Sequence, residues 1–232
     1  MEKFGIIGAM ELEVSKLKEQ MTIERILEKA TMKFYEGTLR GKNVVVVQCG
    51  VGKVNAGICV QILCDEFHVT DIINTGVAGS LNDELDIGDF VIATDAVYHD
   101  VDVTPWGYKP GQVPGLDVRF FPTSQKMLDT AKRCCDKMSS EISYRCGRIA
   151  SGDQFVNSKE LKEKIVNEFH PYCTEMEGCA IAHAAYLNKI PFIIIRVMSD
   201  KANDLEEIDS VTFEKQAATR CAAFIIDFIE AL

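Results

Sequence analysis

The chain has 232 residues, of which 47% are hydrophobic and 26% are charged, and its formal net charge at pH 7 is −10. This composition is typical of a folded globular protein with a sizeable core, and it argues against a disordered chain. The negative charge and a pI near 5.0 argue against a general nucleic-acid binder, which would need a cationic surface.

The predicted elements follow one another as a single domain, residues 1–232, without a Pro/Ser-rich linker. Strands are predicted at residues 4–7, 23–29, 33–39 and 43–48, and others near Asp71, Asp89, Tyr144, Tyr172 and Phe192. Helices are predicted at residues 11–20, 54–67, 124–138, 158–168, 178–188 and 212–231. The alternation predicts an α/β fold, a three-layer α/β/α sandwich with a central mixed β-sheet.

Small and ionisable residues follow several predicted strands at the point where each strand ends. The run Pro191 to Ile195 is typical of a strand buried on both faces, and it continues into Arg196, Ser199 and Asp200. Because ligands of parallel α/β sheets bind beyond the carboxyl ends of the strands, we expect these tips to form one crevice. The other tips are residues 8–13, 49–53, 75–80 and 151–156.

Carboxylates stand out among these residues, because Glu13, Glu175, Glu177 and Asp200 all follow predicted strand ends. They would supply the base for water and the acid for a leaving group that a hydrolysis needs. One of Glu175 and Glu177 could accept hydrogen bonds from the vicinal hydroxyls of a sugar. Acids at the start of a helix explain the same pair equally well. Phe155 could stack on an aromatic ligand or simply pack against the protein.

Residues 99–121 interrupt the alternation with a long segment rich in proline, glycine and aromatic residues, including Trp106 and Tyr108. Long ordered loops are often functional, so the segment is interpreted as a lid or a subunit contact. A loop folded on its own core is the alternative.

Other patterns are weak or negative. Gly50 to Asn55 lacks the third glycine of a dinucleotide-binding loop, and Lys53 does not complete a phosphate-binding loop. The nine cysteines and four histidines show no metal-ligand spacing, so we expect reduced thiols and no metal. No apolar stretch reaches the roughly 18 residues of a membrane span, and no signal peptide is recognised, so we expect a cytoplasmic protein without membrane contact.

Five motifs stand out when their order and spacing are taken together. They are Gly5-Ile6-Ile7-Gly8-Ala9-Met10-Glu11-Leu12-Glu13, Gly50-Val51-Gly52-Lys53-Val54-Asn55-Ala56, Asn74-Thr75-Gly76-Val77-Ala78-Gly79, Glu175-Met176-Glu177 and Ser199-Asp200. This set resembles the 5′-methylthioadenosine/S-adenosylhomocysteine nucleosidases of the nucleoside phosphorylase superfamily, and the resemblance spans nearly the whole chain. It implies a nucleoside phosphorylase-like fold, a homodimer, and hydrolysis of an adenine–ribose bond without metal or cofactor.

The resemblance also implies the substrates and the catalytic pair. The N-glycosidic bond of 5′-methylthioadenosine, S-adenosylhomocysteine and 5′-deoxyadenosine would be cleaved, releasing adenine and the 5-substituted ribose. Glu13 would activate water and Asp200 would protonate adenine N7. The remaining substrate-binding residues implied by the resemblance are Met10, Val51, Gly79, Phe155, Val156, Glu175, Met176, Glu177, Arg196 and Ser199.

Individual roles follow from the same resemblance. Ser199 would orient Asp200, Phe155 would stack on adenine, and the backbone of Val156 would read the edge of the base. Met176 and Glu177 would hold the ribose, while Glu175 and Arg196 would help to position the water. A neighbouring subunit would complete the 5′ pocket with Val103, Trp106, Tyr108 and Pro114.

The chain departs from the family pattern at three places. Val77 replaces a serine of some relatives, and Trp106 replaces a common phenylalanine. The usual aromatic residue does not align clearly within Asp209-Ser210-Val211-Thr212-Phe213, where Phe213 could substitute for it. Three alternative functions stay open: a phosphorylase that uses phosphate instead of water, an aminodeoxyfutalosine nucleosidase, and a nucleoside-binding protein without catalytic activity. Glu13 favours hydrolysis over phosphorolysis.

Overall fold

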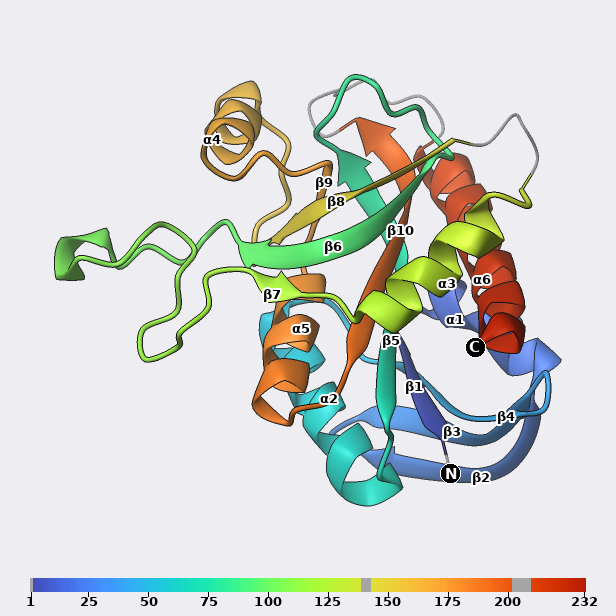
Figure 1. Cartoon of the computed structure of the whole chain (residues 1–232). Coiled ribbons are helices and arrows are strands. Elements are labelled where there is room, and N and C mark those ends of the chain that lie inside the picture. Colours follow the sequence, from blue (N-terminus) through green and yellow to red (C-terminus); the bar gives the residue numbers. More distant parts are fainter. Residues whose placement is uncertain (1, 139–142, 202–209) are drawn as a thin grey trace.

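A computed structural model describes residues 2–138, 143–201 and 210–232 (Figure 1). Its centre is a mixed β-sheet with the strand order β10-β6-β8-β9-β5-β1-β4-β3-β2, and β7 pairs with β6 outside this order. The strands are β1 (Lys3–Gly8), β2 (Thr22–Lys29), β3 (Met32–Leu39), β4 (Lys42–Gln48), β5 (Asp71–Ser80), β6 (Phe90–Tyr98), β7 (Phe121–Pro122), β8 (Tyr144–Ser151), β9 (Cys173–Glu175) and β10 (Phe192–Lys201).

Helices lie on both faces of this sheet, so the predicted three-layer α/β/α fold class is confirmed. The predicted helix at residues 124–138 is shorter than expected, because it ends at Cys135 in a turn. The helices are α1 (Glu11–Gln20), α2 (Lys53–Phe67), α3 (Gln125–Cys135), α4 (Lys159–Phe169), α5 (Gly178–Leu187) and α6 (Ser210–Ala231), with a 3₁₀ turn, η1 (Thr104–Trp106).

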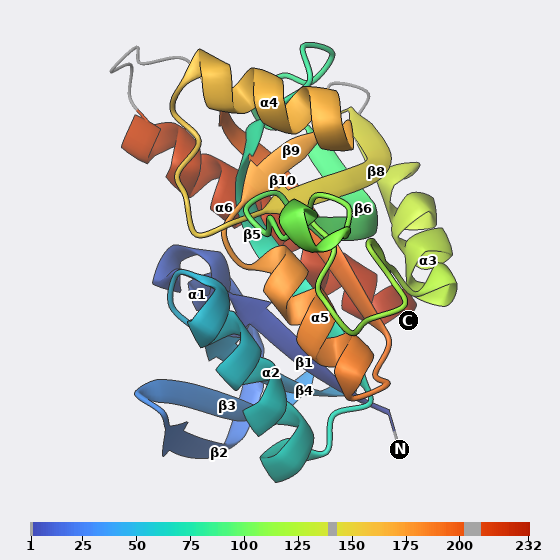
Figure 2. The same ribbon diagram turned by 90° about the vertical axis from the view of Figure 1, so that its left-hand side faces the viewer.

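The alternation of side chains along the central strands explains the layers. On β1, Phe4 and Ile6 pack with residues of α1, α3 and α6, whereas Ile7 packs with residues of α2 and α5 on the opposite face. Helices α2 and α5 lie side by side on that face (Figure 2). Helix α4 contributes to a smaller cluster with β6 and β8. In the described ranges, no helix is long and apolar enough to cross a membrane.

Strand β5 positions the site, because its two edges have different neighbours. Along one edge it pairs with parallel β10 from Ile72 to Ser80. Along the other edge, parallel β1 pairs with it only as far as Asn74, and antiparallel β9 pairs with it at Gly79 and Ser80. Within the described sheet, residues 75–78 therefore have no strand partner along that second edge, and the chain opens there into a cavity.

Candidate active site

A cavity of about 200 Å³ lies at this opening, and side chains from distant parts of the chain line it. All four carboxylates that follow predicted strand ends contribute to it, as do the predicted residues Met10, Val51, Gly79, Phe155, Val156, Met176 and Ser199. Arg196 lies beneath this lining and is 2% exposed. Sequence reasoning missed Gln154, Thr174 and Glu214 as lining residues, although the first two neighbour predicted ones.

Backbone N–H groups that follow β1 and lie within β5 hold the carboxylate of Glu13. Its Oε2 accepts hydrogen bonds from the amides of Ala9 at 2.6 Å and Met10 at 3.0 Å, and its Oε1 accepts from the amide of Val77 at 3.0 Å. Gly76 allows this approach, since a Cβ there would collide with the carboxylate. Burial raises the pKa of Glu13, although Arg196 and the amides oppose the rise. A fixed carboxylate with a raised pKa is suited to accept a proton.

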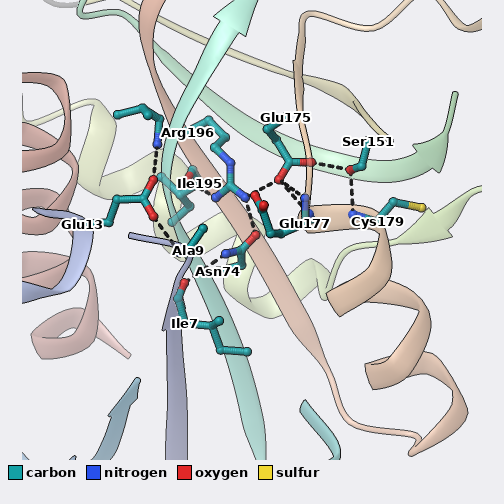
Figure 3. Close-up of polar contacts among 12 residues, drawn as sticks. Ile7, Ala9, Glu13, Asn74, Ser151, Glu175, Glu177, Cys179, Ile195 and Arg196 are labelled. Carbon is teal, nitrogen blue, oxygen red and sulfur yellow. Dashed lines mark hydrogen bonds and ion pairs between the residues drawn. The ribbon is translucent and has the colours of Figure 1, made fainter. Parts of the chain in front are cut away.

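Glu175 and Arg196 form a buried ion pair with 2.6 Å between Oε2 and Nη2 (Figure 3). Glu175 also accepts hydrogen bonds from the Ser151 hydroxyl and from the amides of Glu177 and Gly178. Burial raises the pKa of Glu175, but Arg196 and these donors outweigh it, so that the pKa is lowered. Glu175 is therefore an anchor for Arg196 and for the start of α5.

Arg196 has further partners in the protein. Its Nη2 also donates to the side-chain oxygen of Asn74, and its Nη1 donates to the carbonyl oxygen of Ile195 at 3.2 Å. The Nε of Arg196 is buried without a hydrogen-bond partner in the described part of the chain. Because an unpaired buried donor is costly, this Nε is suited to hold a water molecule or a ligand oxygen.

The charge state of Glu177 changes near neutral pH. Its Oε1 accepts a hydrogen bond from the amide of Gly52 at 2.7 Å. Burial, and then the negative charge of Glu175, raise the pKa of Glu177 to about 7. The group is therefore partly protonated at neutral pH and fully ionised only above it.

Asp200 reaches the cavity from the end of β10. The pairing with β5 shifts between Met198 and Asp200, so Ser199 is the extra residue of a β-bulge. Bulges redirect side chains, and here the Ser199 hydroxyl donates a hydrogen bond to Oδ2 of Asp200 at 2.8 Å. Asp200, from β10, and Glu13, from the first turn of α1, line the same cavity. The arrangement brings together an acid and a base candidate.

The two aromatic candidates, Phe155 and Phe213, differ in their position relative to the cavity. Phe155 is 72% exposed at the cavity, so it is not packed into the protein and has a face available for stacking. Phe213 is half-buried and does not line the cavity, where the next residue, Glu214, does. Asp209 lies outside the described residues.

The residues of the segment 99–121 that are predicted to form the 5′ pocket do not line this cavity. Val103, Trp106, Tyr108 and Pro114 are absent from its lining, and Trp106 is 76% exposed. The loop that carries η1 projects away from the sheet (Figure 1). Within the described chain, no group of three or more His, Cys, Asp or Glu side chains could hold a metal ion.

Comparisons with known proteins agree with this geometry. A family model described as the phosphorylase superfamily matches residues 3–230. A 5′-methylthioadenosine/S-adenosylhomocysteine nucleosidase of Staphylococcus haemolyticus is 39% identical over 229 residues, which cover 98% of this chain and 99% of that protein. The chain belongs to the phosphorylase superfamily.

Solved structures are similar over the full chain. A 5′-methylthioadenosine/S-adenosylhomocysteine nucleosidase of Colwellia psychrerythraea in complex with adenine has a TM-score of 0.95 and 37% identity, covering 100% of this chain and 96% of that one. A futalosine hydrolase of Helicobacter pylori has a TM-score of 0.93 and 31% identity, covering 100% and 98%. The fold and the whole length are therefore shared with nucleoside-cleaving enzymes.

Proposed function

We propose that the chain is a single-domain N-glycosidic hydrolase that cleaves 5′-methylthioadenosine and S-adenosylhomocysteine into adenine and the 5-substituted ribose. The observation that carries the proposal is the pairing of Glu13 and Asp200 across one cavity. The similarity to nucleosidases of that name over nearly the whole length supports the choice of substrate. 5′-Deoxyadenosine carries the same adenine–ribose bond and belongs to the same proposal.

The proposed mechanism assigns one proton transfer to each of these two residues. Glu13 accepts a proton from a water molecule that the Nε of Arg196 helps to orient, and the water attacks the anomeric carbon. Asp200, oriented by Ser199, donates a proton to adenine N7, so that adenine leaves as a neutral base. The ribose passes through an oxocarbenium-like state, and the carboxylate of Glu177 stabilises its positive charge.

Substrate binding is divided among the other lining residues. Phe155 stacks on adenine and the backbone of Val156 reads its edge, while Met176 and Glu177 hold the ribose. Met10, Val51 and Gly79 complete the wall around the nucleoside. Support comes from the cavity, which all of these residues line, and from the exposed face of Phe155.

The charge of the cavity favours water over phosphate as the nucleophile. Among the described residues the lining includes no lysine, arginine or histidine, whereas it includes five carboxylates. The nearby cation, Arg196, is already paired with Glu175. A phosphate dianion would be repelled here, since anion sites use cationic groups or helix N-termini.

The experiment that tests the function is adenine release in phosphate-free buffer. We expect the purified protein to release adenine from 5′-methylthioadenosine, and added phosphate to leave the rate unchanged. Strict dependence on phosphate would identify a phosphorylase instead. Binding of 5′-methylthioadenosine without adenine release would identify a nucleoside-binding protein.

A second candidate substrate is aminodeoxyfutalosine, which the similarity to a futalosine hydrolase suggests. The two candidates share adenine and ribose and differ at the 5′ position. A comparison of kcat/KM for 5′-methylthioadenosine, S-adenosylhomocysteine and aminodeoxyfutalosine would rank them. We expect the first two to be cleaved best.

The pKa of Glu177 predicts how substrate binding depends on pH. A carboxylate accepts hydrogen bonds from ribose hydroxyls, so the ionised form binds better. Since the pKa of Glu177 is about 7 in the empty site, we expect kcat/KM to fall as the pH decreases from 8 to 5.5. In Glu177→Gln, kcat/KM should be lower throughout and the fall should become smaller, because only the protonation of Glu13, whose pKa burial also raises, then contributes to it. A wild-type kcat/KM that is flat over this range would contradict the prediction.

The exposed apolar side chains around α2 and α5 support the further proposal of a homodimer. Val54 is 72% exposed and Leu187 is 59% exposed, and the apolar surface also includes Ile58 and Tyr186. Trp106 lies in η1, on the loop that projects away from the sheet (Figure 1), and is 76% exposed. We propose that a second copy buries this surface and that the loop of each copy completes the partner's cavity. Sedimentation of the purified protein tests this proposal.

Trp106 provides a prediction for the 5′ pocket. If this loop completes the cavity of a second copy, Trp106→Ala removes apolar contact with the 5′-methylthio group. We expect KM for 5′-methylthioadenosine to rise about tenfold, and KM for adenosine to change less. Ile26→Ala, which removes another exposed apolar side chain on β2, is the control. Equal KM values for Trp106→Ala and the wild type would contradict the lid interpretation.

The setting of the enzyme is part of the proposal. All nine cysteines are present as free thiols, the state that a reducing cytoplasm maintains. We therefore propose a cytoplasmic enzyme that acts in the salvage of methionine sulfur. The proposed substrate supports the role in sulfur salvage, because 5′-methylthioadenosine carries the sulfur in its methylthio group.

A further inference from the structure

A cluster of three charged side chains connects the loops around the cavity, although none of the three lines it. The Nζ of Lys53 lies 2.7 Å from Oδ2 of Asp100 and 3.6 Å from Oδ2 of Asp153. The same Oδ2 of Asp100 accepts a hydrogen bond from the amide of Asp153 at 2.8 Å. The side chains of Lys53 and Asp100 are only 24% and 15% exposed, so solvent screens their interaction less than at the surface.

Each member of the cluster lies next to residues with a different role in the cavity. Lys53 is the first residue of α2, directly after Val51 and Gly52. Asp153 lies two positions before Phe155, in the segment that follows β8. Asp100 follows β6 and leads into the loop with η1.

The start of α2 holds two carboxylates at once. The amide of Gly52 donates to Oε1 of Glu177 at 2.7 Å, and the next amide, that of Lys53, donates to Oδ1 of Asp153 at 2.9 Å. Helix N-termini attract carboxylates because their first amides have no partner within the helix. The position of Glu177, which we assign to the ribose, is thereby coupled to the position of the segment that carries Phe155.

The balance of charge explains why the lysine is needed. The cluster contains two carboxylates and one ammonium group within ion-pair distance of both. Without Lys53, Asp100 and Asp153 would repel each other across a partly buried space. The segment that contains Phe155 has no regular secondary structure from Phe155 to Asn157, so it is the part that would move.

We propose that Lys53 is a positioning residue, which holds the adenine-stacking segment and the ribose carboxylate in register through Asp100 and Asp153. The proposal rests on the proposed function, because it takes Phe155 and Glu177 as binding groups. None of the three residues contacts Glu13 or Asp200 in the described hydrogen bonds. Loss of Lys53 therefore weakens binding more than it slows the proton transfers.

The test compares four proteins with the wild type. Lys53→Met removes the charge, Lys53→Arg keeps it, and Lys53→Met with Asp100→Asn removes both the lysine and the repulsion. Lys3→Met is the matched control, because Lys3 and Glu36 form an ion pair of the same 2.7 Å length with 29% and 20% side-chain exposure, away from the cavity. For each protein, kcat and KM for 5′-methylthioadenosine and the Kd for adenine are measured, together with Tm.

We expect Lys53→Met to raise KM and the Kd for adenine about tenfold, with kcat within about threefold of the wild type. Lys53→Arg and the double variant should recover most of this loss, the latter because an asparagine oxygen still accepts from the amide of Asp153. Lys3→Met should match the wild type in KM. The fluorescence of Trp106, the single tryptophan, should change in Lys53→Met, because Asp100 anchors its loop.

Three results would overturn the proposal. The first is a Lys53→Met protein with wild-type KM and adenine affinity. The second is a double variant that is no better than Lys53→Met, and the third is a loss of kcat alone, since either of these would assign Lys53 a different role. Failure of the wild type itself to release adenine would instead overturn the proposed function, while the Kd for adenine would still test the positioning role.

Discussion

Glu13→Gln is expected to lower kcat for adenine release about 10²–10⁴-fold, the range that a positioned base contributes. The physical reason is that the amide of glutamine cannot accept the proton of the attacking water. Glutamine has nearly the same shape as glutamate, so the substrate still fits. Adenine release from 5′-methylthioadenosine at saturating concentration measures the effect.

The same substitution has a structural cost that can be measured separately. Three backbone amides donate to the carboxylate of Glu13, and the glutamine NH₂ group must face at least one of them. Two donors facing each other in a buried site cost about 1–3 kcal/mol. We expect a lower Tm but a cooperative unfolding transition.

Controls separate the lost base from a general disturbance of α1. Glu11→Gln changes an exposed acid two positions away, which pairs with Lys18, and it should leave kcat and Tm unchanged. Glu13→Asp keeps the charge but retracts the carboxylate from its three amides, so it should also lose most of kcat. A Glu13→Gln protein that releases adenine at the wild-type rate would exclude Glu13 as the base.

Much of the cavity could be predicted because it depends on the ends of strands. An unbroken apolar run such as Phe192 to Ile195 predicts a strand with both faces buried, and polar residues directly after it then lie at the sheet edge. In the structure, Glu13, Glu177 and Asp200 line one cavity there. The position of a strand end depends on residues that are neighbours in the sequence, so the sequence pattern predicts it.

Other features could not be predicted because they depend on pairings between distant segments. The sequence predicts a strand near Tyr172, but it does not indicate that this three-residue strand, β9, pairs with both β5 and β8. Asp100 meets Lys53 47 positions away. The ion pair between Arg196 and Glu175 likewise joins two strands that are separate in the sequence. No spacing rule indicates such contacts.

Asp200→Asn is expected to reduce kcat about as strongly as Glu13→Gln, about 10²–10⁴-fold, while the protein still binds its substrate. Asparagine has the size of aspartate, and its side-chain oxygen can still accept the hydrogen bond from Ser199. It has no proton to give to adenine N7, so adenine would have to leave as an anion. We expect the Kd of 5′-methylthioadenosine, measured by calorimetry, to stay within about threefold of the wild type.

A change of leaving group distinguishes the acid from the base. p-Nitrophenyl 5-methylthioriboside releases p-nitrophenolate, a stable anion that needs no protonation, so Asp200→Asn should cleave this substrate at nearly the wild-type rate. Glu13→Gln should fail on both substrates, because the attacking water still needs its base. Asp129→Asn, on the exposed side of α3, is the control for the loss of a carboxylate. If Asp200→Asn lost both substrates equally, Asp200 would not be the acid, since its effect would not depend on the leaving group.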